Sequence, residues 1–243
     1  MKLFKIITAA LCIGMLLNSC KKKFEYVINP DTTLAGKSMV RVYNTALGTS
    51  NNFVFVDNIN INGNQLFYPS LFPSTAYYAA VDAGNRNFVI KDTVPGTIQN
   101  NLSFAANLEP GKKYTIFTYD TVTSVKYTIA EDNIVVPTDT TSRIRFVNLV
   151  FSSTPVPNVD IFSKKLNTNL FTNIAVGSVS DFMAYPSSYG DTLLIRETGT
   201  VNQLVQVNNV NLTQRRNYTL AFRGRYQSTS GTLGRTLTTY TTY

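Results

Sequence analysis

The chain has 243 residues, of which 44% are hydrophobic and only 15% are charged, and its formal net charge is +8. It contains no histidine and two cysteines, which excludes histidine-ligated metal sites and nucleophile arrangements that depend on histidine. The positive charge favours attraction to anionic polymers or headgroups. Because no dense basic stripe or nucleic-acid-binding motif accompanies it, we expect no nucleic-acid partner.

Residues 1–19 have the pattern of a lipoprotein signal peptide. Two lysines precede an apolar run at 6–17, which is too short to span a bilayer comfortably. The run ends in Leu17-Asn18-Ser19-Cys20, which resembles a bacterial lipobox. This resemblance implies cleavage after Ser19, acylation of Cys20 and membrane attachment through the lipid. The alternative is an ordinary signal peptide with a chance cysteine.

The lipid anchor would place the protein in the cell envelope, as an outer membrane lipoprotein. Whether it faces the periplasm or the cell surface stays open. Residues 20–37 would be the acylated cysteine and a flexible tether. Cys12 lies in the leader and Cys20 would be acylated, so the mature chain keeps no thiol for a disulfide or a thiolate metal site. Its domains must therefore be held together by burial alone.

The rest of the chain repeats itself. Val40-Arg41-Val42-Tyr43-Asn44 recurs as Ile144-Arg145-Phe146-Val147-Asn148, and the segment 108–115 recurs at 212–219 with the same offset of 104 residues. We therefore predict two tandem copies of one domain, at residues 38–137 and 143–243, with a polar linker at 138–142.

Each copy has the alternating pattern of β-strands and no helical periodicity. Tyr218, Leu220 and Phe222 alternate with smaller or polar residues, which predicts a strand with one buried face. The strand at 114–119 is apolar on both sides. In the repeated motif, Arg41 and Arg145 fall on the face opposite the apolar residues. Asn62-Gly63 predicts a hairpin turn.

Leu108-Glu109-Pro110-Gly111-Lys112-Lys113-Tyr114 resembles the tyrosine corner of fibronectin type III and related sandwiches, in which the hydroxyl bonds to backbone just upstream. The second copy keeps Leu212 and Tyr218 but lacks the Pro-Gly pair. The chain is therefore expected to be all-β, with two tandem immunoglobulin-like antiparallel β-sandwich domains and structural tyrosines at 114 and 218.

The second copy also contains an Arg-Phe-Val-Asn motif, a Val-Asp strand, an aromatic strand and a terminal Tyr-Thr strand, all with counterparts in the first. These blocks are Arg145–Asn148, Val159–Phe162, Phe182 with Tyr185, and Asn217–Leu220. In this order they are similar to envelope lipoproteins that carry the domain of unknown function 4397. The resemblance implies a small extracytoplasmic β-sandwich, often tandem and lipid-anchored. It implies no activity and no site residues.

Carboxylates are the remaining candidates for catalysis. Glu131-Asp132, Asp181 and Asp191 lie near strand ends or turns, but nothing in the sequence places two of them across a cleft. The run 58–63 superficially resembles a calcium loop, but Pro69 stands where the bidentate glutamate would be required. We expect no enzyme activity, no cofactor and no metal.

Two features suggest glycan contact. The last strands are basic, and the segments 67–73 and 185–189 are rich in aromatic residues. The favoured interpretation is structural: charged strand edges that block sheet-to-sheet pairing, and loop aromatics folded onto the core.

Five Asp-Thr pairs resemble O-glycosylation sites of some bacterial envelope proteins. Their threonines are Thr32, Thr93, Thr121, Thr140 and Thr192. Asp-Thr is equally typical of a turn start, because the aspartate accepts a hydrogen bond from nearby backbone. Both interpretations stay open.

These features predict a non-catalytic, lipid-anchored cell-envelope protein that acts in adhesion, scaffolding or surface-complex assembly. The alternative is a glycan-binding accessory lipoprotein for polysaccharide capture or uptake. The expected partners are the membrane and either a glycan or an envelope protein.

Overall fold

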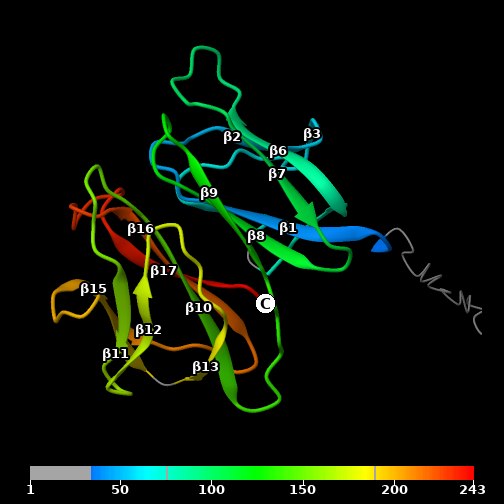
Figure 1. The fold of residues 1–243 in the computed structure, drawn as a ribbon. Helices are drawn as coiled ribbons and strands as arrows, with labels where there is room; N and C mark the ends of the chain where they lie inside the picture. The colour runs from blue at the N-terminus through cyan, green and yellow to red at the C-terminus, as the bar shows by residue number, and fades with distance from the viewer. Residues whose placement is uncertain (1–33, 75, 189) are drawn as a thin grey trace, which may run out of the picture. The chain divides into compact units, whose positions relative to one another are not determined.

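The computed structural model describes residues 34–74, 76–188 and 190–243. The predicted leader, Ser19, Cys20 and Thr32 lie outside these residues. Figure 1 shows that strands dominate the described chain, and their hydrogen bonds group them into four sheets. No helix within the described ranges has the length and hydropathy that a membrane crossing requires.

Nine strands form the first lobe, which we define as residues 37–132. They are β1 (Lys37–Asn44), β2 (Asn52–Val56), β3 (Ile59–Asn60), β4 (Ser70–Phe72), β5 (Ala79–Asp82), β6 (Gly84–Asp92), β7 (Leu102–Leu108), β8 (Lys113–Tyr119) and β9 (Lys126–Glu131). One sheet has the order β4-β1-β8-β9, with β5 also paired to β1, and the other has the order β3-β2-β6-β7.

Eight strands form the second lobe, which we define as residues 141–243. They are β10 (Thr141–Phe151), β11 (Val159–Ser163), β12 (Thr168–Ile174), β13 (Met183–Pro186), β14 (Asp191–Glu197), β15 (Gln203–Val210), β16 (Asn217–Arg225) and β17 (Thr236–Thr241). The sheets have the orders β13-β10-β16-β17 and β12-β11-β14-β15. β10 begins inside the predicted linker 138–142.

The two lobes repeat one strand arrangement. β1 pairs in parallel with β8 in the register Val40↔Tyr114, and β10 pairs in parallel with β16 in the register Ile144↔Tyr218. The second register is the first one moved by 104 residues, the offset of the sequence repeat. The all-β sandwich fold is thus confirmed, and the parallel pair within each lobe is a feature that the sequence analysis did not predict.

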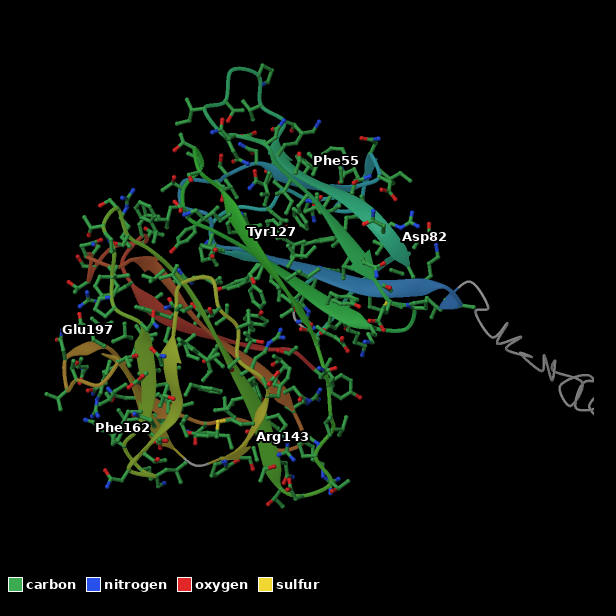
Figure 2. All side chains as sticks on the ribbon, viewed as in Figure 1. Phe55, Asp82, Tyr127, Arg143, Phe162 and Glu197 are labelled. Atoms are coloured by element: carbon green, nitrogen blue, oxygen red, sulfur yellow. The ribbon has the colours of Figure 1, made fainter. Side chains whose placement is uncertain are left out.

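A separate hydrophobic core fills each lobe between its two sheets (Figure 2). In the first lobe, Val40 and Val42 of β1 pack with Phe88 and Ile90 of β6. Alternation along a strand directs every second side chain of β1, β8, β10 and β16 into these cores. The intervening side chains of the same four strands must find another environment.

That environment is a third core, which lies between the lobes. It contains Tyr43, Phe117, Val147, Leu149 and Ala221, all at most 4% exposed. The central strands are therefore buried on both faces. The prediction that the strand around Tyr218 has one buried face was wrong, because its second face packs against the first lobe.

The predicted hairpin turn at Asn62-Gly63 was also wrong. The chain reverses at Asp57 and Asn58, which have φ angles of 48° and 69°, between β2 and β3. Asn62 is buried instead, and its side-chain oxygen accepts a 2.6 Å hydrogen bond from the N–H of Val54. The Asp57 carboxylate accepts hydrogen bonds from Arg86 and from the N–H of Asn87, which fixes the earlier turn.

Candidate functional site

Two arginines at equivalent positions of the repeat meet at the contact between the lobes. Arg41 lies on β1 and Arg145 on β10, and they are 0% and 1% exposed. As predicted, each is on the face of its strand opposite the apolar residues of its own core. Because that face is covered by the other lobe, both guanidinium groups are buried and need partners there.

Asp132, directly after β9, is the acidic partner of this pair. Its Oδ1 lies 2.6 Å from Nη1 of Arg145, and its Oδ2 lies 3.9 Å from Nε of Arg41. Oδ2 also accepts 2.6 Å hydrogen bonds from the hydroxyls of Tyr78 and Thr115. We define the arginine–aspartate centre as Arg41, Arg145, Asp132, Tyr78 and Thr115.

Each arginine reaches across to the other lobe. Arg41 donates to the carbonyl oxygens of Thr242 at 2.6 Å and of Thr241 at 3.4 Å. Arg145 donates to the Thr115 hydroxyl of the first lobe at 3.2 Å, in addition to its ion pair with Asp132. The centre therefore joins the lobes by reciprocal polar contacts, in addition to the apolar third core.

Aromatic rings complete the centre. The Arg41 guanidinium lies 3.8 Å from the ring centre of Tyr78, and that of Arg145 lies 4.8 Å from the ring centre of Phe182, the equivalent residue of the second lobe. Burial, and then the negative charge of Asp132, raise the pKa of the Tyr78 phenol. Tyr78 is thus held as a neutral hydroxyl that donates to the carboxylate.

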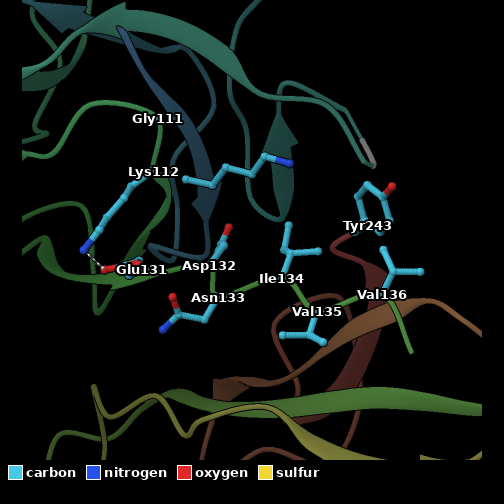
Figure 3. Close-up of a pocket in the computed structure, with 10 residues that line it drawn as sticks. Gly111, Lys112, Glu131, Asp132, Asn133, Ile134, Val135, Val136 and Tyr243 are labelled. Carbon is cyan, nitrogen blue, oxygen red and sulfur yellow. Dashed lines mark hydrogen bonds and ion pairs between the residues drawn. The ribbon is translucent and has the colours of Figure 1, made fainter. Parts of the chain in front are cut away.

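Two clefts flank the segment 131–136, which leaves the centre toward the second lobe. The first cleft, of about 440 Å³, is shown in Figure 3 and is lined by Gly111, Lys112, Lys113, Tyr243 and residues 131–136. The second cleft, of about 300 Å³, shares Glu131, Asn133 and Val135 with the first. The segment is therefore a wall between two hollows.

The charges lining the first cleft are unequally paired. Lys112 Nζ lies 2.8 Å from Glu109 and 3.1 Å from Glu131, and hydrogen bonds to these carboxylates raise its pKa. Lys113 Nζ lies 5.5 Å and 5.4 Å from the ring centres of Tyr78 and Tyr243. No acidic side chain among the described residues forms an ion pair with Lys113.

The carboxylates considered for catalysis have structural roles or lie apart. Asp132 belongs to the centre, and Glu131 pairs with Lys112. Asp191 is buried and accepts hydrogen bonds from Ser163, Tyr185 and two backbone N–H groups. Burial opposes the charge of Asp191, but these donors outweigh it and lower the pKa of the carboxyl. Asp181 is exposed beside the second cleft.

Asp160 is the third buried aspartate, and it accepts from Asn173 N–H and the Thr198 hydroxyl, each at 2.8 Å. Among the described residues, no group of three or more Cys, Asp or Glu side chains is placed to hold a metal ion.

The two tyrosines of the predicted corners make equivalent contacts. The hydroxyl of Tyr114 accepts a 3.1 Å hydrogen bond from the N–H of Glu109, and that of Tyr218 accepts a 3.0 Å bond from the N–H of Thr213. Arg215, with a φ of 58°, takes the place of Gly111, with a φ of 76°. The second corner thus keeps its shape without the Pro-Gly pair.

The described threonines of the Asp-Thr pairs differ in exposure. Thr93 and Thr140 are exposed, whereas Thr121 and Thr192 are half-buried. Asp92 accepts a hydrogen bond from Val94 N–H, and Asp139 accepts one from Thr141 N–H, as the turn interpretation expects. Glycosylation of any of these threonines stays a prediction.

The aromatic and basic segments are largely used inside the fold. Tyr185 is 1% exposed, and the Tyr68 hydroxyl accepts a 2.9 Å hydrogen bond from Arg223 of the second lobe. Arg235 donates to the carbonyl of Leu204 at 3.0 Å. Phe67 is 55% exposed, and Tyr189 lies outside the described residues.

Neither the place of Lys113 in a cleft nor the burial of the two arginines was predicted from the sequence. An available signal was the arginine at the same place in both copies, within strands that are apolar on both sides.

Residues 38–162 match the family described as "Domain of unknown function (DUF4397)". The chain belongs to this DUF4397 family. The match runs from β1 to β11 and so covers the first lobe and the start of the second. Nothing among the curated proteins matches the chain.

Solved structures similar to this DUF4397 protein are distant. One is CBMbc, a family CBM26 module of Eubacterium rectale Amy13K in complex with maltoheptaose, with 12% identity, a TM-score of 0.27 and coverage of 85% of this chain and 97% of that chain. Another is a streptococcal family 41 carbohydrate-binding module, with 12% identity, a TM-score of 0.24 and coverage of 76% and 93%. At these values the similarity says nothing about a ligand of this chain.

Proposed function

We propose that this protein is a non-catalytic, lipid-anchored cell-envelope protein whose two-lobed body serves adhesion, scaffolding or surface-complex assembly. The observation that carries the proposal is the arginine–aspartate centre. It uses the ionisable groups buried between the lobes to hold them together, whereas an enzyme would place such groups where a substrate can reach them.

The other buried carboxylates support the same role. Asp160 and Asp191 each accept several hydrogen bonds inside their lobe. The donors around Asp191 lower the pKa of its carboxyl, which makes this carboxylate a poor proton acceptor. The three buried aspartates of the described residues thus stabilise the fold.

The proposed anchor is compatible with a body displayed near a membrane. Cys20 precedes the start of β1 by 17 residues, which span at most about 60 Å when fully extended. Several acyl chains on Cys20 would give firm attachment, since each buried methylene adds about 0.8 kcal/mol.

Substitution of Cys20 tests the anchor. We expect the protein from its natural host to carry acyl chains on Cys20 by mass spectrometry and to remain with the membrane fraction. Cys20→Ala should move to the soluble fraction with an unchanged unfolding midpoint. An unmodified Cys20, or a variant retained on the membrane as fully as the parent, would contradict the proposal.

A second candidate is a glycan-binding accessory lipoprotein, which the first cleft favours. Its volume of about 440 Å³ falls within the range of small-ligand sites, and Tyr243 offers an aromatic ring at its edge. A glycan array with neutral and acidic saccharides tests this role, and binding to none of them would leave only the first.

A further inference from the structure

Lys113 is the uncompensated cation of the first cleft. Its ammonium lies 5.5 Å from the ring centre of Tyr78 and 5.4 Å from that of Tyr243, and Lys113 is half-buried at the start of β8. A lysine in this position costs side-chain entropy to hold, yet it forms no ion pair with any carboxylate of the described residues.

The acidic side chains that line the cleft, Glu131 and Asp132, are paired with other residues. The Asp132 side chain is 0% exposed and faces the two buried arginines, although the residue itself lines the cleft. Glu131 and Glu109 both pair with Lys112, as Figure 3 shows for Glu131. The cleft thus presents the charge of Lys113 to a ligand, while its neighbour Lys112 is already neutralised.

The opposite wall is apolar. Val135 and Val136 are 61% and 46% exposed, and Tyr243 is 39% exposed, all three lining the same cleft. Aliphatic and aromatic groups left in solvent beside a cation suit a ligand with an anionic group and a ring-sized body. An ammonium is a point charge that can pair with a carboxylate or a phosphate, and the single positive charge of Lys113 matches the single negative charge of a carboxylate.

We infer that the first cleft binds a carboxylate-bearing sugar of the uronic acid class. Its carboxylate pairs with Lys113 Nζ, and its ring lies against Tyr243 and the valines of segment 131–136. This inference rests on the second candidate function and adds to it the contact residues and the charge of the ligand. It is independent of lipid attachment.

The probe is glucuronate, titrated calorimetrically into the full chain, with glucuronate methyl ester as the uncharged ligand of nearly the same shape. We expect glucuronate to bind and the ester to bind at least about tenfold more weakly, since a charge-assisted hydrogen bond is lost. Raising the salt concentration should weaken glucuronate binding.

Three variants locate the site. Lys113→Met should weaken glucuronate binding by at least about tenfold, and Lys113→Arg should retain it. Glu131→Gln removes a negative charge from the cleft wall and should tighten binding by roughly two- to threefold. Lys126→Met is the matched control, because Lys126 pairs with Asp120 outside this cleft and its loss should leave binding unchanged.

Equal binding of glucuronate and its ester, or full binding by Lys113→Met, would overturn the inference. If the ester and neutral saccharides bind as well as glucuronate, a glycan-binding role survives and the acidic specificity fails. If no saccharide binds at all, the second candidate function fails with it, while the lipid-anchored scaffold is unaffected.

Discussion

Single residues at the lobe contact have roles that composition cannot reveal. Asp132 is one carboxylate facing two buried guanidinium groups, and its hydrogen-bond donors come from Tyr78 and Thr115. Breaking a buried ion pair by removing one partner costs more than the pair contributes, because the remaining charges lose their compensation. Substitution of Asp132 should therefore destabilise both lobes.

We expect Asp132→Asn to lower the free energy of unfolding by about 3–5 kcal/mol, measured by chemical denaturation. Asp181→Asn is the matched control, since Asp181 is exposed and lies beside the second cleft. Its effect should stay within about 0.5 kcal/mol. Equal stability of the two variants would show that the centre does not hold the lobes together.

Asp191 gives a pH-dependent prediction. Its folded pKa is lowered by hydrogen bonds, so its contribution to stability is complete above the unfolded value of about 3.9 and is lost as the pH falls through the folded value. Asp191→Asn should cost about 1–3 kcal/mol at pH 7. This difference from the parent should be constant down to about pH 5 and shrink below pH 4 in urea titrations. A difference that grows in acid would reverse the sign of the argument.

Elements show how far pattern reasoning reaches. Alternation within the repeat predicted the strands at 114–119 and 218–223 and the arginine face of the 40–44 motif. The pattern could not predict what covers the second face of these strands. A strand that is apolar on both sides has the same sequence pattern whether its second face is covered within a larger sandwich or by another lobe. The turn predicted at Asn62-Gly63 was wrong because the Asn62 side chain forms hydrogen bonds with the backbone of β2. The preference of Asn-Gly for tight turns gives no information about such a contact.

Gly177 marks a close approach between the lobes. Its φ is 81°, and an added Cβ would overlap the hydroxyl of Tyr119 on β8. We expect Gly177→Ala to lower the free energy of unfolding by about 2–4 kcal/mol, because backbone strain and overpacking act together. Tyr119→Phe in the same chain should recover part of this loss.

Gly199→Ala separates the two causes. Gly199 has a similar φ of 73°, but an added Cβ would meet nothing within 4 Å. It should therefore show the strain alone, about 1–2 kcal/mol. Equal losses at Gly177 and Gly199 would mean that the Tyr119 contact does not constrain the lobes.

At the scale of the whole molecule, the two lobes should unfold together. Separating them would expose the third core and leave Arg41, Arg145 and Asp132 without their partners from the other lobe. We expect calorimetry to show one transition whose van't Hoff and calorimetric enthalpies agree. Two resolved transitions, or residues 141–243 melting alone at the temperature of the full chain, would contradict this.

The duplication could be predicted from the sequence, because packing and turn residues such as Tyr114 and Tyr218 recur at a constant spacing. The contact between the two copies could not be predicted, because Arg145 contacts Asp132 and Thr115 of the other copy and no local sequence pattern links these residues. The cleft beside Lys113 was inaccessible for the same reason.

The hydrogen bonds of Arg41 also constrain the order of folding. Its acceptors at Thr241 and Thr242 lie 200 and 201 residues further along the chain. During synthesis this guanidinium is therefore made long before its carbonyl partners, and contacts of such separation form slowly. The end of β17 and the residue after it thus supply partners to the first lobe as well as to the second. A nascent chain interrupted before residue 236 would leave Arg41 of β1 without these acceptors.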